Sequence, residues 1–202
     1  MRAIDDAVAA IRAGRPVVLP FDTVYGLAAD PYVEAATLAV YRLKGRVETQ
    51  PSALVARDLE QLLECVPELA GRPAAIAREL LPGPFTLIFP NPARRFRWLT
   101  GASPEALGVR VPALTDPSRE VLARVGALVA TSANRPGERD PRTLSDVPEE
   151  MRDAAVAVDG GPLPGTPSTV IDLTASAPRV LREGAVSSAE ALRRLHPAVR
   201  SG

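Results

Sequence analysis

The chain has 202 residues, and its 24 basic and 24 acidic side chains give a formal net charge of zero. This balance argues against a broadly basic nucleic-acid-binding surface, so any RNA contact needs a local patch or partner proteins. Cys65 is the sole cysteine, so no internal disulfide can form, which is typical of a reducing compartment. The chain start lacks a signal-peptide core, and no apolar run approaches the roughly 20 residues of a membrane span. We therefore expect one cytoplasmic domain over 1–202, with no membrane contact.

Apolar residues recur at helical spacing in some segments and form short β-branched runs in others. The helices predicted in chain order are 3–13, 33–43, 58–66, 73–81, 117–125 and 188–195. The predicted strands are 17–19, 52–56, 85–89, 107–111, 127–131, 155–158, 169–173 and 179–182. Because some strands follow one another without a helix between them, the pattern predicts an α/β domain with a mixed sheet. The stretches 133–148 and 159–167 are predicted to be loops.

Two helix starts carry capping signals. Asp116 before Pro117 is typical of a capping Asp and a Pro at the first helical position. Ser187 with Glu190 is typical of a capping box.

A polar cluster follows the first strand, at Pro20–Leu27. Active-site groups often lie at strand ends in α/β domains. There Thr23 could hydrogen-bond a small polar ligand and Tyr25 could supply a wall. Taken alone, the cluster is better interpreted as a connection to a helix, with Asp22 as its cap.

Lys44 is the sole lysine among the 24 basic residues, and Gly45 and Arg46 follow it. A lysine point charge and an arginine fork can converge on one polyphosphate. Cations at a helix C-terminus are also common for electrostatic reasons alone.

Further polar groups interrupt or end apolar strands. Arg110 lies between Val109 and Val111, so it faces either solvent or a pocket that would suit a carboxylate. The sequence Thr-Ser-Ala-Asn at 131–134 could hold ribose, base or phosphate oxygens, or form a polar turn. Similar polar strand ends occur at 167–173 and 181–184.

Several classes of enzyme are excluded by missing motifs. The chain has no Walker loop, no G-x-G-x-x-G fingerprint and no G-x-S-x-G elbow. Its one cysteine and its one histidine, His196, cannot build a zinc site, and we expect His196 at the surface.

In order, the motifs P-x-D-T-V-Y-G-L, K-G-R, L-P-G-P-F-T-L, G-V-R-V-P, T-S-A-N, P-S-T-V-I-D-L and L-R-E-G resemble the YrdC family of threonylcarbamoyl-adenylate synthases. The resemblance covers about residues 4 to 195 and matches the short bacterial form. It implies a three-layer fold with a twisted mixed β-sheet, flanking helices and a large concave cavity.

The resemblance also implies an activity: ATP, L-threonine and bicarbonate give threonylcarbamoyl-AMP and pyrophosphate, for modification of a tRNA adenosine next to the anticodon. Mg²⁺ would arrive with ATP, without a protein-ligated metal, and tRNA-modification proteins would be partners. The residues implied for threonine are Thr23, Arg110 and Ser168. Those implied for ATP are Lys44, Arg46, Gln50, Ser132, Asn134 and Arg182, with Lys44 and Arg46 as the catalytic pair.

The chain departs from the family pattern around the amino-acid pocket. Phe21 replaces the usual Thr, Val47 replaces the usual Pro, and the strand containing Val55 lacks a histidine that some members carry. Two alternatives stay open: a carbamoyl-transfer domain of related fold, and a non-catalytic RNA-binding module using the basic cluster at 94–97. The first usually belongs to longer chains with zinc-finger cysteines, and the balanced charge disfavours the second.

Overall fold

A computed structural model describes residues 2–200, with side chains up to Leu195. The side chain of His196, expected at the surface, lies outside the described part. The helices of the described chain are α1 Arg2–Arg12, α2 Glu34–Lys44, α3 Leu59–Cys65, α4 Arg72–Leu80, α5 Ser118–Val125, α6 Glu149–Ala154 and α7 Ser188–Arg200. None of these helices has the length and apolarity needed to cross a membrane.

The strands form one mixed sheet with the order β7-β1-β2-β6-β3-β5-β4-β8-β9. Their bounds are β1 Val17–Pro20, β2 Tyr25–Ala29, β3 Ala53–Ala56, β4 Phe85–Pro90, β5 Ala106–Arg110, β6 Ala127–Ser132, β7 Val156–Ala157, β8 Thr169–Asp172 and β9 Arg179–Arg182. The pairs β1–β7, β3–β5 and β4–β8 are parallel, and the other pairs are antiparallel. The predicted mixed sheet is therefore confirmed.

Strand β2 corrects the interpretation of the first polar cluster. Pro20 pairs with Tyr25, so residues 21–24 are the loop of an antiparallel hairpin rather than the entry to a helix. All five residues of β2 are buried, and the strand pairs with β1 on one side and with β6 on the other. Asp22 consequently caps no helix.

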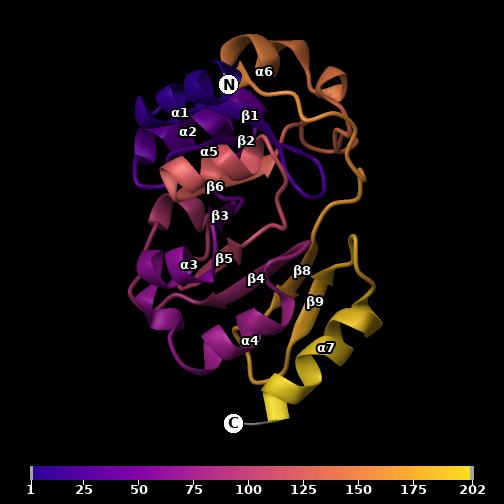
Figure 1. Ribbon diagram of the computed structural model, residues 1–202. Helices are drawn as coiled ribbons and strands as arrows, with labels where there is room; N and C mark the ends of the chain where they lie inside the picture. Colours follow the sequence, from indigo (N-terminus) through magenta and orange to yellow (C-terminus); the bar gives the residue numbers. More distant parts are fainter. Residues whose placement is uncertain (1, 201–202) are drawn as a thin grey trace.

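The two faces of the sheet are covered to different extents (Figure 1). Helices α2, α3, α4 and α7 bury apolar residues against one face, in a core that includes Leu54, Phe85 and Val109. On the other face, α1 and α5 pack on the half of the sheet that includes Val55 and Leu128. Side chains alternate along a strand, so Ala53 lies on the same face as Val55. No helix of that second core covers the other half of this face, towards β4 and β8.

Helix ends agree with most of the sequence signals. Gly45 ends α2 with φ of 69°, a left-handed conformation that glycine adopts readily. Only half of the predicted capping box is present at α7: the Ser187 hydroxyl accepts a hydrogen bond from the Glu190 backbone N–H, but the Glu190 carboxylate pairs with Arg194. The helix predicted at 117–125 is present as α5, but its predicted cap was wrong, because Pro117 occupies the cap position and the Asp116 carboxylate instead pairs with Arg119.

Candidate functional site

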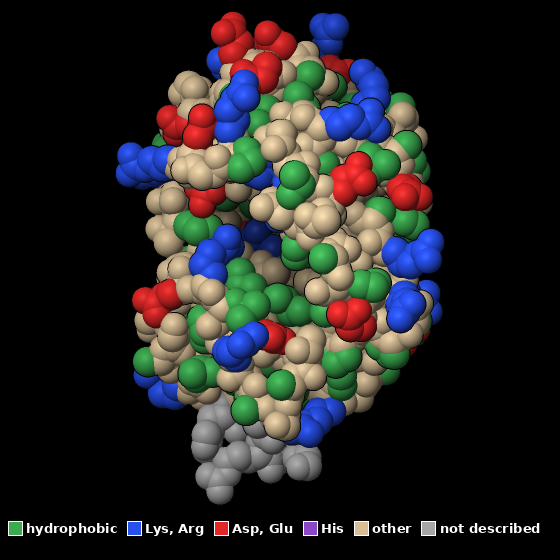
Figure 2. Space-filling model, turned by 180° about the vertical axis from the view of Figure 1, so that it is seen from behind, with side chains coloured by type: hydrophobic (Ala, Val, Ile, Leu, Met, Phe, Trp, Pro, Cys, Tyr) green, Lys and Arg blue, Asp and Glu red, His purple; other side chains and the backbone are tan. Residues whose placement is uncertain are grey.

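The uncovered half of the sheet forms the floor of a cavity of about 600 Å³. Ala53, Gly108, Thr86 and Val170 lie on this floor, and small side chains there leave room above the sheet. Ligand sites in proteins have volumes of roughly 300–1,000 Å³. Figure 2 shows a hollow near the middle of the molecule, with blue Lys or Arg side chains inside it.

Seven of the nine predicted site residues line this cavity: Thr23, Lys44, Arg46, Arg110, Ser132, Ser168 and Arg182. They come from the β1–β2 loop, the end of α2, the ends of β5, β6 and β9, and the segment before β8. The fold therefore brings together groups that are far apart in the sequence.

Lys44, the last residue of α2, is buried and held by three acceptors. Its Nζ donates to the Asn134 carbonyl and to Asn134 Oδ1, both at 2.8 Å, and to the Ser132 carbonyl at 2.5 Å. Burial, together with the smaller effect of the nearby Arg46 charge, lowers the pKa of Lys44 to about 8. A compact ammonium with three donors suits this arrangement better than a planar guanidinium would.

Arg46 extends from the residue after the α2 cap. Its Nη1 donates to Thr131 Oγ1 at 2.8 Å, and its Nη2 donates to the Pro51 carbonyl. Its Nε is buried without a partner among the described residues. Burial lowers the pKa of Arg46, and the charge of Arg182 acts in the same direction.

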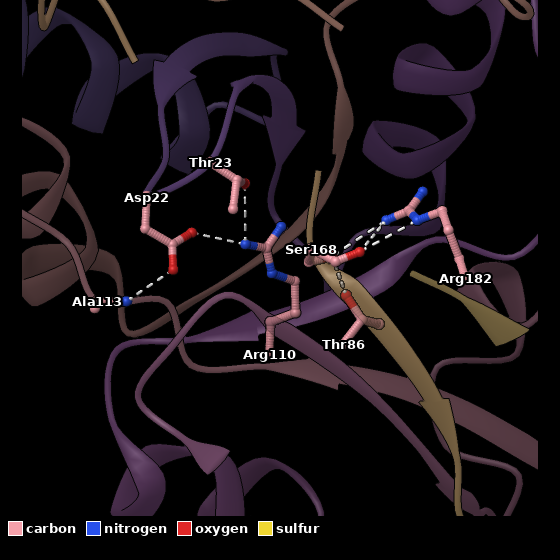
Figure 3. A network of polar contacts seen from close by, with 7 residues as sticks. All are labelled: Asp22, Thr23, Thr86, Arg110, Ala113, Ser168 and Arg182. Carbon is pink, nitrogen blue, oxygen red and sulfur yellow. Dashed lines mark hydrogen bonds and ion pairs between the residues drawn. The ribbon is translucent and has the colours of Figure 1, made fainter. Parts of the chain in front are cut away.

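Arg110 faces the cavity while Val109 and Val111 lie in the opposite core, which decides between the two orientations left open above. Its Nη2 donates to Asp22 Oδ1 at 2.7 Å and lies 3.5 Å from Thr23 Oγ1 (Figure 3). Burial lowers the pKa of Arg110, and the Asp22 charge opposes that shift. Burial also raises the pKa of Asp22, against the opposing effect of Arg110.

Across the cavity, Ser168 links two strands. Its Oγ lies 2.8 Å from Thr86 Oγ1, and its carbonyl accepts hydrogen bonds from Arg182 Nη2 at 2.8 Å and Nε at 3.2 Å (Figure 3). Ser168 is buried, so this network fixes the hydroxyl at one place on the cavity wall.

Two predicted site residues do not line the cavity. Asn134 is buried behind it and contacts Lys44 and the Ser132 hydroxyl. Gln50 is exposed, one residue before Pro51 in the cavity wall. Contrary to expectation, Tyr25 does not form part of the cavity wall, because it is buried in the core and its hydroxyl donates to Asp159 Oδ1 at 2.9 Å.

Sequence reasoning missed Asp22, Phe21 and Thr86 as site residues. Thr86 had a usable signal, since it is a polar residue inside an otherwise apolar strand. The Asp22–Arg110 pair had none, because the two residues are 88 positions apart.

The described residues contain no group of three His, Cys, Asp or Glu side chains that could hold a metal ion. Cations and hydroxyls dominate the polar lining, and among the described residues that form it there is no Cys or His. The arrangement can bind an anion, position it and stabilise negative charge, and its lining provides no thiol or imidazole nucleophile.

Comparisons with known proteins point to one family. The family model Sua5/yciO/yrdC, described as telomere recombination, matches residues 9–184. A protein of Mycobacterium tuberculosis named putative threonylcarbamoyl-AMP synthase is 34% identical over 192 residues, covering 93% of this chain and 86% of the relative.

Solved structures agree with the match. The crystal structure of Pyrococcus abyssi Sua5 complexed with L-threonine has a TM-score of 0.80 and 32% identity, over 95% of this chain and 56% of that one. Escherichia coli YciO has a TM-score of 0.78 and 27% identity, over 95% of this chain and 93% of that one. The chain therefore spans little more than half of the Pyrococcus protein and nearly all of YciO.

Proposed function

The chain belongs to the Sua5/yciO/yrdC family, and we propose that it is a threonylcarbamoyl-AMP synthase that uses ATP, L-threonine and bicarbonate. The observation that carries this proposal is the single cavity of about 600 Å³ that gathers cations and hydroxyls from distant segments. A nucleotide triphosphate and a small amino acid are both anions, and both would meet complementary charge there.

The proposed reaction has two steps. The amine of threonine adds to bicarbonate, with loss of water, and gives a carbamate. A carbamate oxygen then attacks the α-phosphorus of ATP, forming threonylcarbamoyl-AMP as pyrophosphate leaves. Neither step needs a protein nucleophile, so the protein contributes positioning and charge stabilisation.

The threonine end of the site is assigned to Arg110, Thr23 and Ser168. The Arg110 side chain lines the cavity and is 12% exposed, and only its Nη2 is bonded to Asp22, so its remaining N–H groups are assigned to the carboxylate. Thr23 and Ser168 also line the cavity, and their hydroxyls would fix the rest of the amino acid. This leaves the amine free to react.

The phosphate end is assigned to Lys44, Arg46 and Arg182, together with the Ser132 hydroxyl. Lys44 and Arg46 are the catalytic pair, since they would neutralise charge as the bond to pyrophosphate breaks. Asn134 would act indirectly, because its side-chain oxygen accepts a hydrogen bond from Lys44 and holds the ammonium in position. Gln50 stays a prediction on the nucleotide side.

Mg²⁺ would enter this site together with ATP. The described residues include no three-ligand cluster for a metal ion, whereas Mg²⁺ commonly binds through substrate phosphates. Bound there, it would neutralise phosphate charge. The product would serve the modification of a tRNA adenosine beside the anticodon in the cytoplasm, with partner proteins that complete the transfer.

The proposal can be tested by measuring pyrophosphate release from ATP, in reactions to which threonine and bicarbonate are each added or omitted. Release should depend on both, and release that ignores either one contradicts the assignment. Lys44→Ala should lower the rate strongly, while Arg119→Ala should not. Arg119 is a suitable control because its side chain is 69% exposed.

The alternative of a non-catalytic RNA-binding module has less support. In the basic cluster at 94–97, Arg95 is already paired with Glu68, its Nε lying 2.7 Å from Glu68 Oε2. RNA affinity that falls steeply with salt, without ATP turnover, would favour this alternative.

A further inference from the structure

The Arg110 guanidinium is supported on two sides by neighbouring residues of the β1–β2 loop. The Asp22 carboxylate accepts from Nη2 at 2.7 Å, and the Phe21 ring lies 5.9 Å from the guanidinium carbon. The first contact is a charge-assisted hydrogen bond and the second is a cation–π contact. One loop therefore contacts both an edge and a face of the same planar group.

Asp22 is itself held in place. Its second oxygen accepts from the backbone N–H of Ala113 at 3.1 Å, and its side chain is only 6% exposed. Both carboxylate oxygens thus have donors from segments beyond the loop, and Asp22 cannot turn toward solvent without losing them (Figure 3).

The Phe21 ring packs against Gly26, where the lack of a side chain leaves room for it. The ring is 4% exposed, and a Cβ built on Gly26 would lie 2.4 Å from a ring carbon. The ring therefore rests directly on the backbone of β2. The aromatic support of Arg110 therefore depends on Phe21 and Gly26 together.

We propose that Asp22 and Phe21 are positioning residues that hold Arg110 in one orientation, leaving its unpartnered edge free for the threonine carboxylate. This proposal rests on the function proposed above for Arg110. It predicts that the loop sets the affinity for threonine and has little influence on the affinity for ATP, because the phosphate end uses other cations.

Two readouts test this on the full chain, with Asp22→Asn and Phe21→Leu compared with Asp5→Asn. Asp5 is a matched control, since it pairs with Arg124 on the surface, outside the cavity. The first readout is the Arg110 Nε–H signal in a ¹⁵N NMR spectrum of the ligand-free protein, assigned by its loss in Arg110→Lys. The second is the KM for threonine, the KM for ATP and kcat, from pyrophosphate release.

In Asp22→Asn the Arg110 signal should broaden or shift, and the KM for threonine should rise about ten- to hundred-fold, as expected for one lost charge-assisted contact. Phe21→Leu should change both in the same direction, by a smaller factor. The KM for ATP and kcat should stay within about three-fold of the wild type, a split that simple loss of folded protein does not produce.

An unchanged Arg110 signal, or a KM for threonine equal to that of Asp5→Asn, overturns the proposal. If thermal melting shows Asp22→Asn to be unfolded, Phe21→Leu decides, because it keeps the ion pair. If the wild type shows no threonine-dependent release, the proposed function fails, and the NMR signal alone decides whether the loop positions Arg110.

Discussion

The contact between Phe21 and Gly26 makes a quantitative prediction for Gly26→Ala. The added Cβ would lie 2.4 and 2.6 Å from two Phe21 ring carbons and 3.2 Å from the Thr131 carbonyl oxygen. The ring is buried beneath Arg110, so it cannot move away freely. Overpacking of this kind costs about 1–3 kcal/mol, and replacing Gly by Ala recovers about 0.4–1 kcal/mol through the unfolded state. We expect the free energy of unfolding to fall by about 1–2 kcal/mol.

Urea unfolding, with an unchanged m-value, measures this loss. Gly108→Ala is the matched control in the same cavity, because its Cβ would meet Thr86 Cγ2 at an ordinary 3.7 Å. That variant should be as stable as the wild type or slightly more stable. In a Phe21→Ala background, Gly26→Ala should no longer destabilise the protein. A Gly26→Ala variant as stable as Gly108→Ala, or a penalty that persists without the ring, would refute the reasoning.

Three further substitutions test other contacts of the site. Lys44→Met should raise the KM for ATP about ten-fold or more. In the wild type the KM for ATP should also increase when the pH exceeds 8, because Lys44 then loses its proton. Pyrophosphate-release assays across this pH range should show no such increase in the variant. Tyr25→Phe removes the hydroxyl bonded to Asp159, so urea unfolding should show a loss of about 1–2 kcal/mol. Thr86→Val removes one of two partners of the Ser168 hydroxyl, the other being Arg182, so the KM for threonine should rise a few-fold while the KM for ATP stays unchanged in the same assay.

The regular elements were largely predictable because their signals are local. Strand 179–182 was predicted with its observed bounds, and most others within one or two residues. Strand β2 was missed because Tyr25 and Gly26 follow a polar cluster, which is typical of a turn. Its strand character comes from pairing on both sides, with β1 and with β6, and neither partner is visible from a local window.

The membership of the site was predictable mainly through resemblance, and its internal contacts were not. Arg110 alone allowed a solvated or a pocket orientation, and only the uncovered half of the sheet decides between them. Asp22 was assigned to a cap because a carboxylate after a strand often has that role. Its actual partner lies on β5, and only the register of the sheet brings the two together.

The cavity also explains why overall composition gave no indication of an anion site. A chain with zero formal net charge places four cations in one hollow: Lys44, Arg46, Arg110 and Arg182. Burial lowers the pKa of both Arg46 and Arg110, and the charge of Arg182 acts in the same direction, as expected for cations that share a poorly solvated space.

Among these four cations, within the described part of the chain, only Arg110 is ion-paired with a carboxylate. Pairing with Asp22 reduces the attraction of Arg110 for a highly charged ligand and still leaves donors for a singly charged one. The other three cations have no carboxylate partner among the described residues, so they would attract a triphosphate more strongly. Under the proposed function, this unequal pairing would direct the two anionic substrates to different ends of one cavity, with the threonine amine and the α-phosphorus between them.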